Sequence, residues 1–595
     1  MCGIVGYIGK ENATKIVLDC LKRLEYRGYD SAGIGVLSLD GNLQISKTKG
    51  QVEELYDIKR IKGKIAIGHT RWATHGEPTK ENAHPHIDCK KNIAVVHNGI
   101  IENYFELRKK LISNGHKFLS KTDSEVIPHI LEEFIDEGIE KSVIKATKIL
   151  KGTYAFAVIH SKENKIIVVR KENPVIIGNS KFGKFFCSDI PAILRYTNLV
   201  FSLENEEIGI LNEDKIVVKS FGNKIKRKKW KRINWDLATA EKGGYEHYML
   251  KEIFEQPRAI VETMIDGYDK CRLIGKKLIE FDRIDITACG SSYHAGLVGK
   301  HIFENIAMIP TNVEISSEYR YRKQIEKRNT ILIGISQSGE TADTLAAIRN
   351  AKQHGIYLLG ITNSIGSSMA RESDVVFLTN AGPEICVVAT KTFLAQLVAL
   401  YLLAFSFRER KKLQPIFGLS EQLRLFPRWV ENILDKKETI KKISETVANE
   451  KNVFYIGRGI CYPVCMEGAL KLKETAYIHS ECFPAGELKH GALALITDGT
   501  LVIGTVIQDE TYEKMLGNLM EVGARGAKTI AIGFKENEKE IRQYSDLFIP
   551  IPKTPPLFSP IPITVVFQLL AYYTARELAC EIDKPRNLAK SVTVE

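Results

Sequence analysis

A pattern of apolar strands, each followed by a helical segment, occurs twice in the second half of this 595-residue chain. About 170 residues separate the matching segments, which are IDITACGSSYHAGL with NVFYIGRGICYPVC, ILIGISQSGETADTL with LVIGTVIQDETYEKM, and RESDVVFLTN with QYSDLFIPIP. Strands that alternate with helices are typical of a parallel sheet with helices on its faces. The match predicts an internal duplication of one α/β domain, over roughly residues 285–405 and 450–570.

The first 235 or so residues have a different pattern. Short β-type runs such as IVGYI, GIGVLSL, NIAVVH and KIIVVR alternate with turns, which predicts a mixed domain dominated by sheets. Helical segments at 245–278 and 420–449 are predicted to connect the units. The basic run IKRKKWKRINWD at 225–236 is predicted to be a solvated linker rather than a nucleic-acid site.

Composition narrows the class of protein. The net charge of +12 (84 − 72) is a mild excess for a chain of this length, and 44% hydrophobic with 26% charged residues is typical of globular proteins. The most apolar run, 394–407, is shorter than the ~20 residues of a membrane-spanning helix, so no membrane span is expected. No export signal is apparent, and the 11 scattered cysteines suit a reducing compartment, the cytoplasm. The Cys461 and Cys465 pair lacks a second pair, so no metal site is predicted.

Cys2 is a candidate nucleophile. Removal of Met1 would place its thiol and a free α-amine on one residue, and an amine with a pKa of ~7.7 to 8.0 can serve as the base. The strings YRGYDSAG, HTRWATHG, NAHPH and HNGIIEN are dense in polar residues where a sheet domain presents loops. Asn98 and Gly99 can together bind an oxyanion, although the dipeptide by itself favours a tight turn.

The first repeat carries a candidate phosphate site. Ser336, Ser338 and Thr341 surround Gly339 between an apolar strand and a helix, where hydroxyls and free helix N–H groups can meet a dianion. The turn CGSSYHAG adds two serines. The second repeat has lost the serine pair in IGRGICYP and is poor in phosphate-binding groups in TVIQDET, which predicts a single phosphate site centred on the first repeat.

The second repeat carries candidate acids and bases. Glu467, Lys471 and Glu474 have i, i+4 and i+7 spacing on one helix face, followed by His490 in GELKHG. A solvated salt-bridge stripe is the ordinary interpretation of such spacing. The intervening Ala469 and leucines instead predict a largely buried helix.

Taken together, these strings resemble a known family. The first 235 residues are similar to the glutaminase domain of class II, N-terminal-cysteine glutamine amidotransferases. The whole chain, through the C-terminal LAKSVTVE, resembles the glucosamine-6-phosphate synthase family. The resemblance implies an α+β sandwich of the N-terminal-nucleophile type followed by two parallel-sheet α/β sugar-isomerase (SIS) domains. The implied boundaries are 1–235 for the amidotransferase domain, 236–284 for a linker with connecting helices, 285–410 for the first SIS domain, 411–449 for connecting helices, 450–580 for the second SIS domain and 581–595 for a catalytic tail.

The resemblance also implies a role for each motif residue of the amidotransferase domain. Cys2 attacks the side-chain amide of L-glutamine, and Asn98 with Gly99 forms the oxyanion hole. Arg71 binds the α-carboxylate of glutamine and Asp123 its α-amine. Thr74, His75 and Gly76 line the pocket, and Trp72 gates an internal passage for ammonia.

For the SIS domains, the resemblance implies that D-fructose 6-phosphate becomes D-glucosamine 6-phosphate. The sugar phosphate binds Ser291, Ser292, Ser336, Gln337, Ser338, Thr341 and Val387. Glu474 moves a proton between sugar C1 and C2, Lys471 assists, His490 opens the ring and Lys590 forms an imine with the sugar. It also implies a homodimer that uses no metal or organic cofactor and binds neither nucleic acid nor membrane.

Two departures and two alternatives remain. The family pattern GVASTK is CVVATK here, at 386–391, and TPPLFSPIP at 554–562 also differs, which leaves sugar affinity open. An amidotransferase acting on phosphoribosyl pyrophosphate, or on aspartate with ATP, would need an acidic phosphoribosyl loop or an SGG-type pyrophosphate loop, and neither string is present. A non-catalytic sugar-phosphate sensor would leave Cys2, Glu474, His490 and Lys590 without a use.

Overall fold

The structure, a computed structural model, describes residues 2–55, 57–72, 75–233, 242–323, 329–414, 416 and 418–593. Contacts divide the chain into two units, residues 1–241 with 589–595 and residues 242–588.

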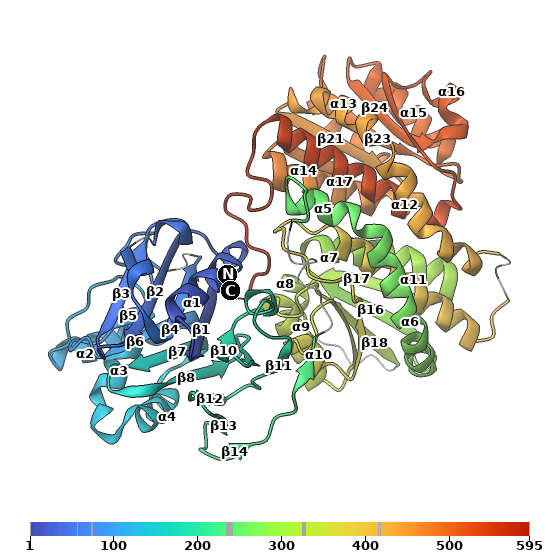
Figure 1. Ribbon diagram of the computed structural model, residues 1–595. Helices are drawn as coiled ribbons and strands as arrows, with labels where there is room; N and C mark the ends of the chain where they lie inside the picture. The colour runs from blue at the N-terminus through green and yellow to red at the C-terminus, as the bar shows by residue number, and fades with distance from the viewer. Residues whose placement is uncertain are drawn as a thin grey trace. The chain divides into compact units, whose positions relative to one another are not determined.

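The N-terminal unit is built on two antiparallel sheets (Figure 1). Within the described residues, one sheet has the order β15 (Lys231–Arg232), β11 (Leu199–Ser202), β9 (Ile176–Asn179), β10 (Gly183–Cys187), β1 (Gly3–Gly9), β4 (Gly63–Arg71), β2 (Ser31–Ser38), β3 (Leu43–Thr48). The other has the order β14 (Ile225–Lys226), β13 (Ile216–Ser220), β12 (Glu207–Leu211), β8 (Glu163–Lys171), β7 (Gly152–His160), β6 (Ile93–Ile101), β5 (His86–Ile87).

The side chains of β1 show why the two sheets stack. Ile4 and Ile8 point into a core shared with β6, β7 and β8, whereas Val5 and Tyr7 point the opposite way, against α1 (Ala13–Lys22). Alternation with period two places apolar groups on both faces, so both faces must be covered. The outer face of the second sheet packs on α2 (Tyr104–Ser113), α3 (Val126–Glu133) and α4 (Ile139–Ile149). The result is a helix–sheet–sheet–helix sandwich, as the resemblance implied.

The basic run at 225–236 is partly built into this sandwich. Within it, β14 pairs with β13 and β15 with β11, each at a sheet edge. The Lys228 ammonium lies 2.6 Å from a carboxylate oxygen of Glu207 and 3.0 Å from one of Glu204. The prediction of a free linker was therefore wrong for 225–233, because charged edge strands form without an apolar pattern. Residues 234–236 lie outside the described part.

The C-terminal unit contains two parallel five-stranded sheets with the same strand order. In the described residues they run β17 (Thr311–Ile315), β16 (Arg283–Ala288), β18 (Thr330–Ile335), β19 (Tyr357–Thr362), β20 (Val375–Leu378), and β22 (His479–Pro484), β21 (Asn452–Gly457), β23 (Leu501–Val506), β24 (Lys528–Phe534), β25 (Leu547–Ile551). Each order is second, first, third, fourth, fifth in chain sequence. The duplication predicted from the sequence is present in the topology.

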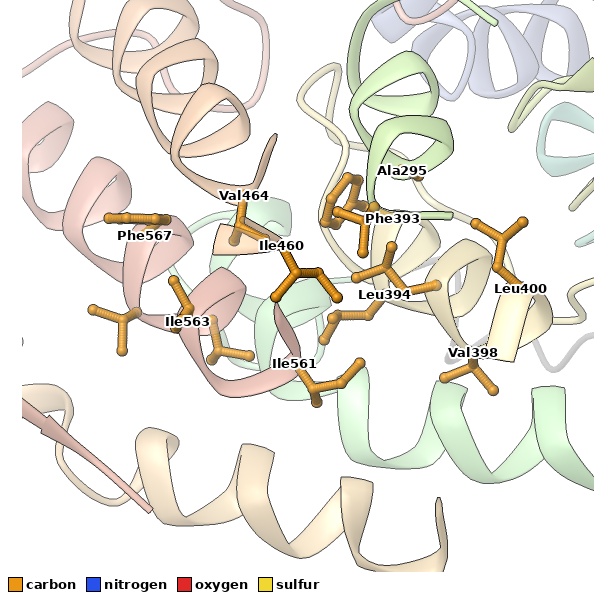
Figure 2. Packing of buried hydrophobic residues seen from close by; sticks show 14 of the residues in the cluster. Ala295, Phe393, Leu394, Val398, Leu400, Ile460, Val464, Ile561, Ile563 and Phe567 are labelled. Carbon is orange, nitrogen blue, oxygen red and sulfur yellow. The ribbon is translucent and has the colours of Figure 1, made fainter. Parts of the chain in front are cut away.

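Helices between the two sheets form one shared core. It combines α5 (Tyr248–Phe254), α6 (Gln256–Leu278), α7 (Gly290–Ile302) and α11 (Lys391–Arg410) with α12 (Phe426–Leu434), α13 (Lys437–Ala448), α14 (Cys461–Ala476) and α17 (Pro560–Glu577). Figure 2 shows Phe393 and Leu394 of α11 in this core with Val464 of α14 and Ile561 of α17. The outer faces pack on α9 (Ala342–Gln353) and α15 (Tyr512–Gly523). The two halves therefore depend on each other for burial.

Two of these helices are long and apolar enough to cross a membrane by length and composition. Their apolar windows, in Lys391–Arg410 and Pro556–Glu577, are 78% and 94% buried inside the structure. Both helices belong to the shared core.

Candidate active sites

Cys2 lies at the start of β1, beside the end of β4. Gly3 pairs with Thr70 in the sheet, so continuing this register places Cys2 opposite Arg71, the residue before Trp72. The Trp72 N–H donates to Cys2 Sγ at 3.3 Å, and the thiol lies 3.4 Å from the Trp72 carbonyl oxygen. Burial raises the pKa of the Cys2 thiol, while the positive amino terminus of the chain acts to lower it. The thiol therefore needs a base to become nucleophilic.

Asn98 and Gly99 lie inside β6, not in a tight turn. Asn98 Nδ2 donates to the Cys2 carbonyl oxygen at 2.9 Å, and Asn173 Nδ2 donates to the Asn98 carbonyl oxygen at 2.9 Å. Gly99 has φ +132°, and a Cβ there would lie 2.0 Å from the Thr153 carbonyl oxygen, so only glycine fits. The amide donor of Asn98 is thus fixed beside the candidate nucleophile.

Arg71 and Asp123 supply a buried cation and a buried anion to the same region. The Arg71 guanidinium donates to the carbonyl oxygens of Gly76, at 3.0 Å, and Glu77, at 3.2 Å, and also to that of His75. The Asp123 carboxylate accepts from the Ile101 N–H at 2.8 Å and the Ser124 hydroxyl at 3.2 Å. Both charges act on the pKa of Cys2. A cation and an anion flanking a thiol suit the two charged ends of an amino acid.

Two aromatic contacts describe the rest of the loop. Trp72 packs edge-on against Tyr29, with ring centroids 5.8 Å apart, and His75 packs edge-on against Tyr104 at 5.6 Å. Thr74 lies outside the described residues.

A group of buried histidines packs beside this site. No role was predicted for these histidines from the sequence. His69 stacks on His84 with ring centroids 4.0 Å apart, and His84 meets His86 edge-on at 4.5 Å. His69 Nε2 lies 2.9 Å from the His97 carbonyl oxygen, and His97 Nδ1 lies 2.8 Å from the hydroxyl of Ser124, next to Asp123. Burial lowers the pKa of all four histidines, that of His97 to about 4. These four histidines therefore stay neutral at pH 7. In the sequence, the signal for them was that they lie in short strings rich in polar residues.

The candidate phosphate loops begin side by side. Ala288 and Ile335 are register partners at the carboxyl ends of β16 and β18, so the loops that follow start at adjacent positions. This is the point where the strand order reverses, which is where open α/β sheets bind ligands. Ser291 and Ser292 open α7 from one loop, and the loop from Ser336 to Thr341 leads into α9 from the other.

Internal hydrogen bonds shape the second of these loops. Ser336 Oγ accepts from the Gly339 N–H at 3.1 Å and lies 2.9 Å from Thr341 Oγ1, while Ser338 Oγ accepts from the Glu340 N–H at 3.2 Å. The Gln337 carbonyl oxygen accepts from the Asn363 N–H at 3.0 Å. Gly339 has φ +63°, and a Cβ there would meet Ser367 Oγ at 2.2 Å. The loop is thus folded tightly around its glycine.

Lys471 joins the acids of α14 to the serines of the first half. Its Nζ is 2.7 Å from Glu474 Oε2 and 3.2 Å from Glu467 Oε1, and it donates to Ser291 Oγ at 3.0 Å. His294 Nδ1 lies 2.8 Å from Glu467 Oε2. Burial by itself would lower the pKa of Lys471, but the two glutamates raise it above its ordinary value, so the ammonium stays charged. The predicted phosphate loop and the predicted acid–base helix meet here.

Other predicted residues fall elsewhere. Ser292 Oγ accepts from Gln396 Nε2 at 3.0 Å. The Val387 N–H donates to the Asp583 carbonyl oxygen at 3.0 Å and is therefore already used. If the loop at Val387 contacts the sugar, the contact would use a different backbone group. The His490 ring is exposed and has no hydrogen bond within the described part of the chain. Its predicted role has no contact with Glu474 or Lys471 to support it.

The C-terminal segment before Lys590 is anchored to the C-terminal unit. The Asp583 carboxylate accepts from the N–H groups of Tyr248 and Met249, both at 2.9 Å, at the start of α5. The Arg586 guanidinium lies 4.3 Å from the centroid of the Tyr477 ring, just beyond α14. Residues 589–595, with a half-buried Lys590, are grouped with the N-terminal unit. The imine role of Lys590 therefore stays a prediction.

Comparisons with known proteins agree with this organisation. A glutamine amidotransferase domain model matches residues 69–195, and an SIS domain model matches residues 277–406 and 446–577. Glutamine–fructose-6-phosphate aminotransferase (isomerizing) of Caldanaerobacter subterraneus subsp. tengcongensis is 48% identical over 612 residues, and that of Aquifex aeolicus 47% over 599 residues. Both alignments cover 100% of each chain.

Solved structures match the C-terminal unit. The C-terminal domain of glucosamine-fructose-6-phosphate aminotransferase from Francisella tularensis is 38% identical and gives a TM-score of 0.55, covering 58% of this chain and 100% of that chain. A putative phosphosugar isomerase from Silicibacter pomeroyi, 24% identical with a TM-score of 0.51 over 57% of this chain and 99% of its own, shares the fold.

Proposed function

The chain belongs to the family of glutamine–fructose-6-phosphate aminotransferases, and from this premise we propose how its residues divide the reaction. The reaction makes glucosamine 6-phosphate from fructose 6-phosphate and glutamine. The observation that carries the proposal is the contact of Lys471 with both Glu474 and Ser291, which unites an acid–base helix with a phosphate-type loop. We assign residues 1–235 to the amidotransferase domain, 285–410 and 450–580 to the SIS domains, the segments between them to connecting helices, and 581–595 to the tail.

Glutamine hydrolysis is assigned to Cys2. The α-amine, once Met1 is removed, takes the thiol proton, and the thiolate attacks the side-chain amide carbon. The developing oxyanion is held by Asn98 Nδ2 and the Gly99 N–H. Ammonia leaves, and water then hydrolyses the thioester to release glutamate. The 2.9 Å contact between Asn98 Nδ2 and the Cys2 carbonyl oxygen supports this arrangement.

Glutamine itself is held by charge. Arg71 pairs with the α-carboxylate and Asp123 with the α-ammonium, while His75 and Gly76, together with Thr74, line the pocket. The burial of both charged groups supports this assignment, since a buried charge is stable only when paired. Trp72, whose backbone contacts the thiol, is assigned the gate for ammonia.

Sugar chemistry is assigned to the C-terminal unit with the tail. The phosphate is held by Ser336, Gln337, Ser338 and Thr341 with the α7 serines, and Val387 contributes a backbone group. Lys590 forms an imine at sugar C2, releasing water. Ammonia then displaces the lysine amine and leaves its own nitrogen at C2, and Glu474 transfers a proton between C1 and C2. Lys471, charged and buried, orients Glu474, which their 2.7 Å contact supports.

The active assembly is proposed to be a homodimer in the cytoplasm. His490 is exposed and lacks hydrogen bonds in the described part of its own chain, which suits a histidine that opens the sugar ring in the site of a second copy. All 11 cysteines are free, which suits a reducing compartment.

The experiment is incubation of the purified chain with glutamine and fructose 6-phosphate, followed by detection of amino sugar and glutamate. We expect equal amounts of both products. The Cys2→Ala variant is expected to lose glutamine hydrolysis while it still converts fructose 6-phosphate to glucose 6-phosphate. Folded protein that forms no amino sugar from both substrates would contradict the proposal.

A further inference from the structure

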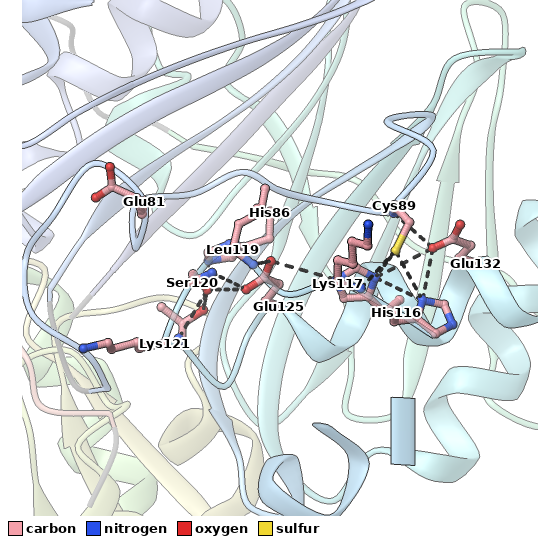
Figure 3. A network of polar contacts seen from close by, with 12 residues as sticks. Glu81, His86, Cys89, His116, Lys117, Leu119, Ser120, Lys121, Glu125 and Glu132 are labelled. Atoms are coloured by element: carbon pink, nitrogen blue, oxygen red, sulfur yellow. Dashed lines mark hydrogen bonds and ion pairs between the residues drawn. The ribbon is translucent and has the colours of Figure 1, made fainter. Parts of the chain in front are cut away.

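Four side chains outside both candidate sites converge on one point of the N-terminal unit. They are Cys89 in the turn between β5 and β6, His116 in the loop after α2, and His129 and Glu132 on α3. Figure 3 shows Cys89, His116 and Glu132 close together. One ligand atom of each, a sulfur, two ring nitrogens and a carboxylate oxygen, lies within 4.8 Å of all the others. The mechanism proposed above uses none of them.

Five of the six separations among these atoms lie near the edge lengths of a tetrahedron around a metal ion. Cys89 Sγ lies 3.7 Å from His116 Nδ1 and 3.6 Å from His129 Nδ1, and the two nitrogens are 3.3 Å apart. Glu132 Oε2 lies 3.2 Å from His116 Nδ1 and 3.7 Å from His129 Nδ1. Zinc bonds of about 2.0–2.1 Å to nitrogen and about 2.3 Å to sulfur, at tetrahedral angles, separate ligand atoms by about 3.3–3.6 Å.

The chemistry of the four groups favours zinc. The Nδ1 atoms of His116 and His129 face each other at 3.3 Å, so they cannot both carry a proton without repulsion. The Cys89 thiol and the Glu132 carboxylate lie beside the same two nitrogens. A cation at the centre would satisfy all four. A sulfur, two imidazoles and one carboxylate form a set that suits Zn²⁺, whereas calcium and magnesium prefer oxygen ligands.

Neighbouring groups hold these ligands as supporting groups do at known zinc sites. His116 Nε2 lies 3.0 Å from Glu133 Oε1, and His129 Nε2 lies 3.9 Å from Glu125 Oε1. The Lys117 N–H is directed at Cys89 Sγ from 3.4 Å. The Glu133 carboxylate fixes the His116 ring with its Nδ1 toward the metal, whereas Glu125 lies beyond hydrogen-bond distance of His129 Nε2. The Lys117 N–H would stabilise a thiolate at Cys89.

We propose that Cys89, His116, His129 and Glu132 bind one Zn²⁺ in a closed, structural site. Four protein ligands leave no open position for a substrate, which separates this site from catalysis. The ion would tie the β5–β6 turn and the α2–α3 loop to α3. β6 carries Asn98 and the α2–α3 loop carries Asp123, so the site would position both for glutamine. These ligands come from three segments and form no paired motif, so the sequence pattern did not predict a metal site.

The first test is the metal content of the full-length protein, purified without chelator and measured by elemental mass spectrometry. We expect about one zinc per chain in the wild type and in two controls, Cys580→Ser and His354→Ala. The Cys89→Ala and His116→Ala variants should lose at least nine-tenths of it. Wild-type protein with less than a tenth of an equivalent after incubation with zinc, or full zinc in the Cys89→Ala/His116→Ala double variant, would overturn the proposal.

Cobalt distinguishes this site from adventitious binding. Protein stripped of metal and titrated with Co²⁺ should show the intense visible bands of tetrahedral cobalt and a thiolate charge-transfer band, and Cys89→Ala should lack the latter. Glu133→Gln, which acts through His116, should bind zinc about 10–100-fold more weakly. Glutaminase activity lost on stripping should return with zinc in the wild type only. Octahedral cobalt spectra, or an unchanged affinity in Glu133→Gln, would contradict the assignment.

Discussion

The two halves of the C-terminal unit share one strand order but differ in the side chains at equivalent positions. In the first half the loops after β16 and β18 carry Ser291 and Ser338, while the aligned positions of the second half are Gly459 and Gln508. The helices differ in the opposite way, because here the charged groups belong to the second half. Glu467, Lys471 and Glu474 on α14 align with Gly299, Phe303 and Ile306, all in the buried helical segment after β16. One copy of the fold supplies phosphate-type loops and the other supplies acids and a base.

This difference teaches that the topology alone does not make the site. Both halves have helix N-termini at the strand-order switch, yet the loops of the second half have Gly459 and Gln508 where those of the first half have Ser291 and Ser338. The functional groups meet because α7 and α14 pack together, with Lys471 donating to Ser291 across the pair. The proposed sugar-phosphate site would therefore combine groups from two unlike halves.

The largest expected effect follows removal of the acid–base group of the second half. Glu474→Gln should lower isomerisation and amino-sugar formation by about 10²–10⁴-fold, because an amide cannot accept the proton. Glutamate release at Cys2 should remain. The matched control Glu513→Gln, an exposed glutamate of the same half, should keep full activity. Steady-state rates of glucose 6-phosphate formation check this, and equal rates in both variants would remove Glu474 from the mechanism.

The next effect concerns stability. Lys471→Met should lower the free energy of unfolding by about 3–5 kcal/mol, because Glu467 and Glu474 would be left without their buried cation. Lys473→Met, an exposed lysine on the same helix, should change it by less than about 0.5 kcal/mol. Urea unfolding of the two variants measures the difference. Similar stabilities would show that the pair is not a structural centre.

The stability difference should also depend on pH. Lys471 lowers the pKa of Glu467, against burial, which raises it. A carboxylate with a depressed pKa contributes its full stability above its unfolded value of about 4.3, and loses it as the pH falls through the folded pKa. In Lys471→Met, burial raises the pKa of Glu467, so the gap in stability between wild type and this variant should be widest near neutral pH and should shrink on acidification as the carboxylate becomes protonated in the variant. A gap that widens on acidification would contradict this charge assignment.

A smaller effect separates the phosphate loops. Ser338→Ala should raise the KM for fructose 6-phosphate about tenfold or more, since a hydrogen bond to a charged group contributes about 1.5–3 kcal/mol. The aligned substitution Gln508→Ala should leave KM unchanged, because the second half is predicted to bind no phosphate. Reversed results for the two variants would move the phosphate site to the second half.

The smallest effect is expected when a serine equivalent to Ser291 of the first half is placed at Gly459 of the second half. Gly459→Ser should lower stability by about 1 kcal/mol, because residue 459 has φ +52° and a side chain disfavours that conformation. It should add no sugar-phosphate binding, since the neighbouring loop lacks hydroxyls equivalent to Ser336 and Ser338. Thermal unfolding and a binding isotherm report the two quantities, and a second binding event would break the comparison.

Much of the fold could be predicted from the sequence, because buried strands and helices have regular patterns of apolar residues. The apolar runs predicted the strands, and their repetition predicted two matching sheets. The contact of Lys471 with Ser291 could not be predicted, because it joins residues 180 positions apart that meet only when the helices pack together. Asn173, which fixes Asn98, also lacked a signal because an isolated asparagine forms no pattern. The edge strand β15 was missed because its residues, Lys231 and Arg232, are charged and exposed.

The central claim is that the duplicated unit holds one sugar-phosphate site, with binding groups from the first half and acid–base groups from the second. The direct measurement is equilibrium binding of fructose 6-phosphate to the full-length Glu474→Gln variant, which should bind the sugar without converting it. We predict one site per chain, with affinity lowered about tenfold or more by adding Ser338→Ala and unchanged by adding Gln508→Ala. Two sites per chain, or affinity lost only with Gln508→Ala, would contradict the account.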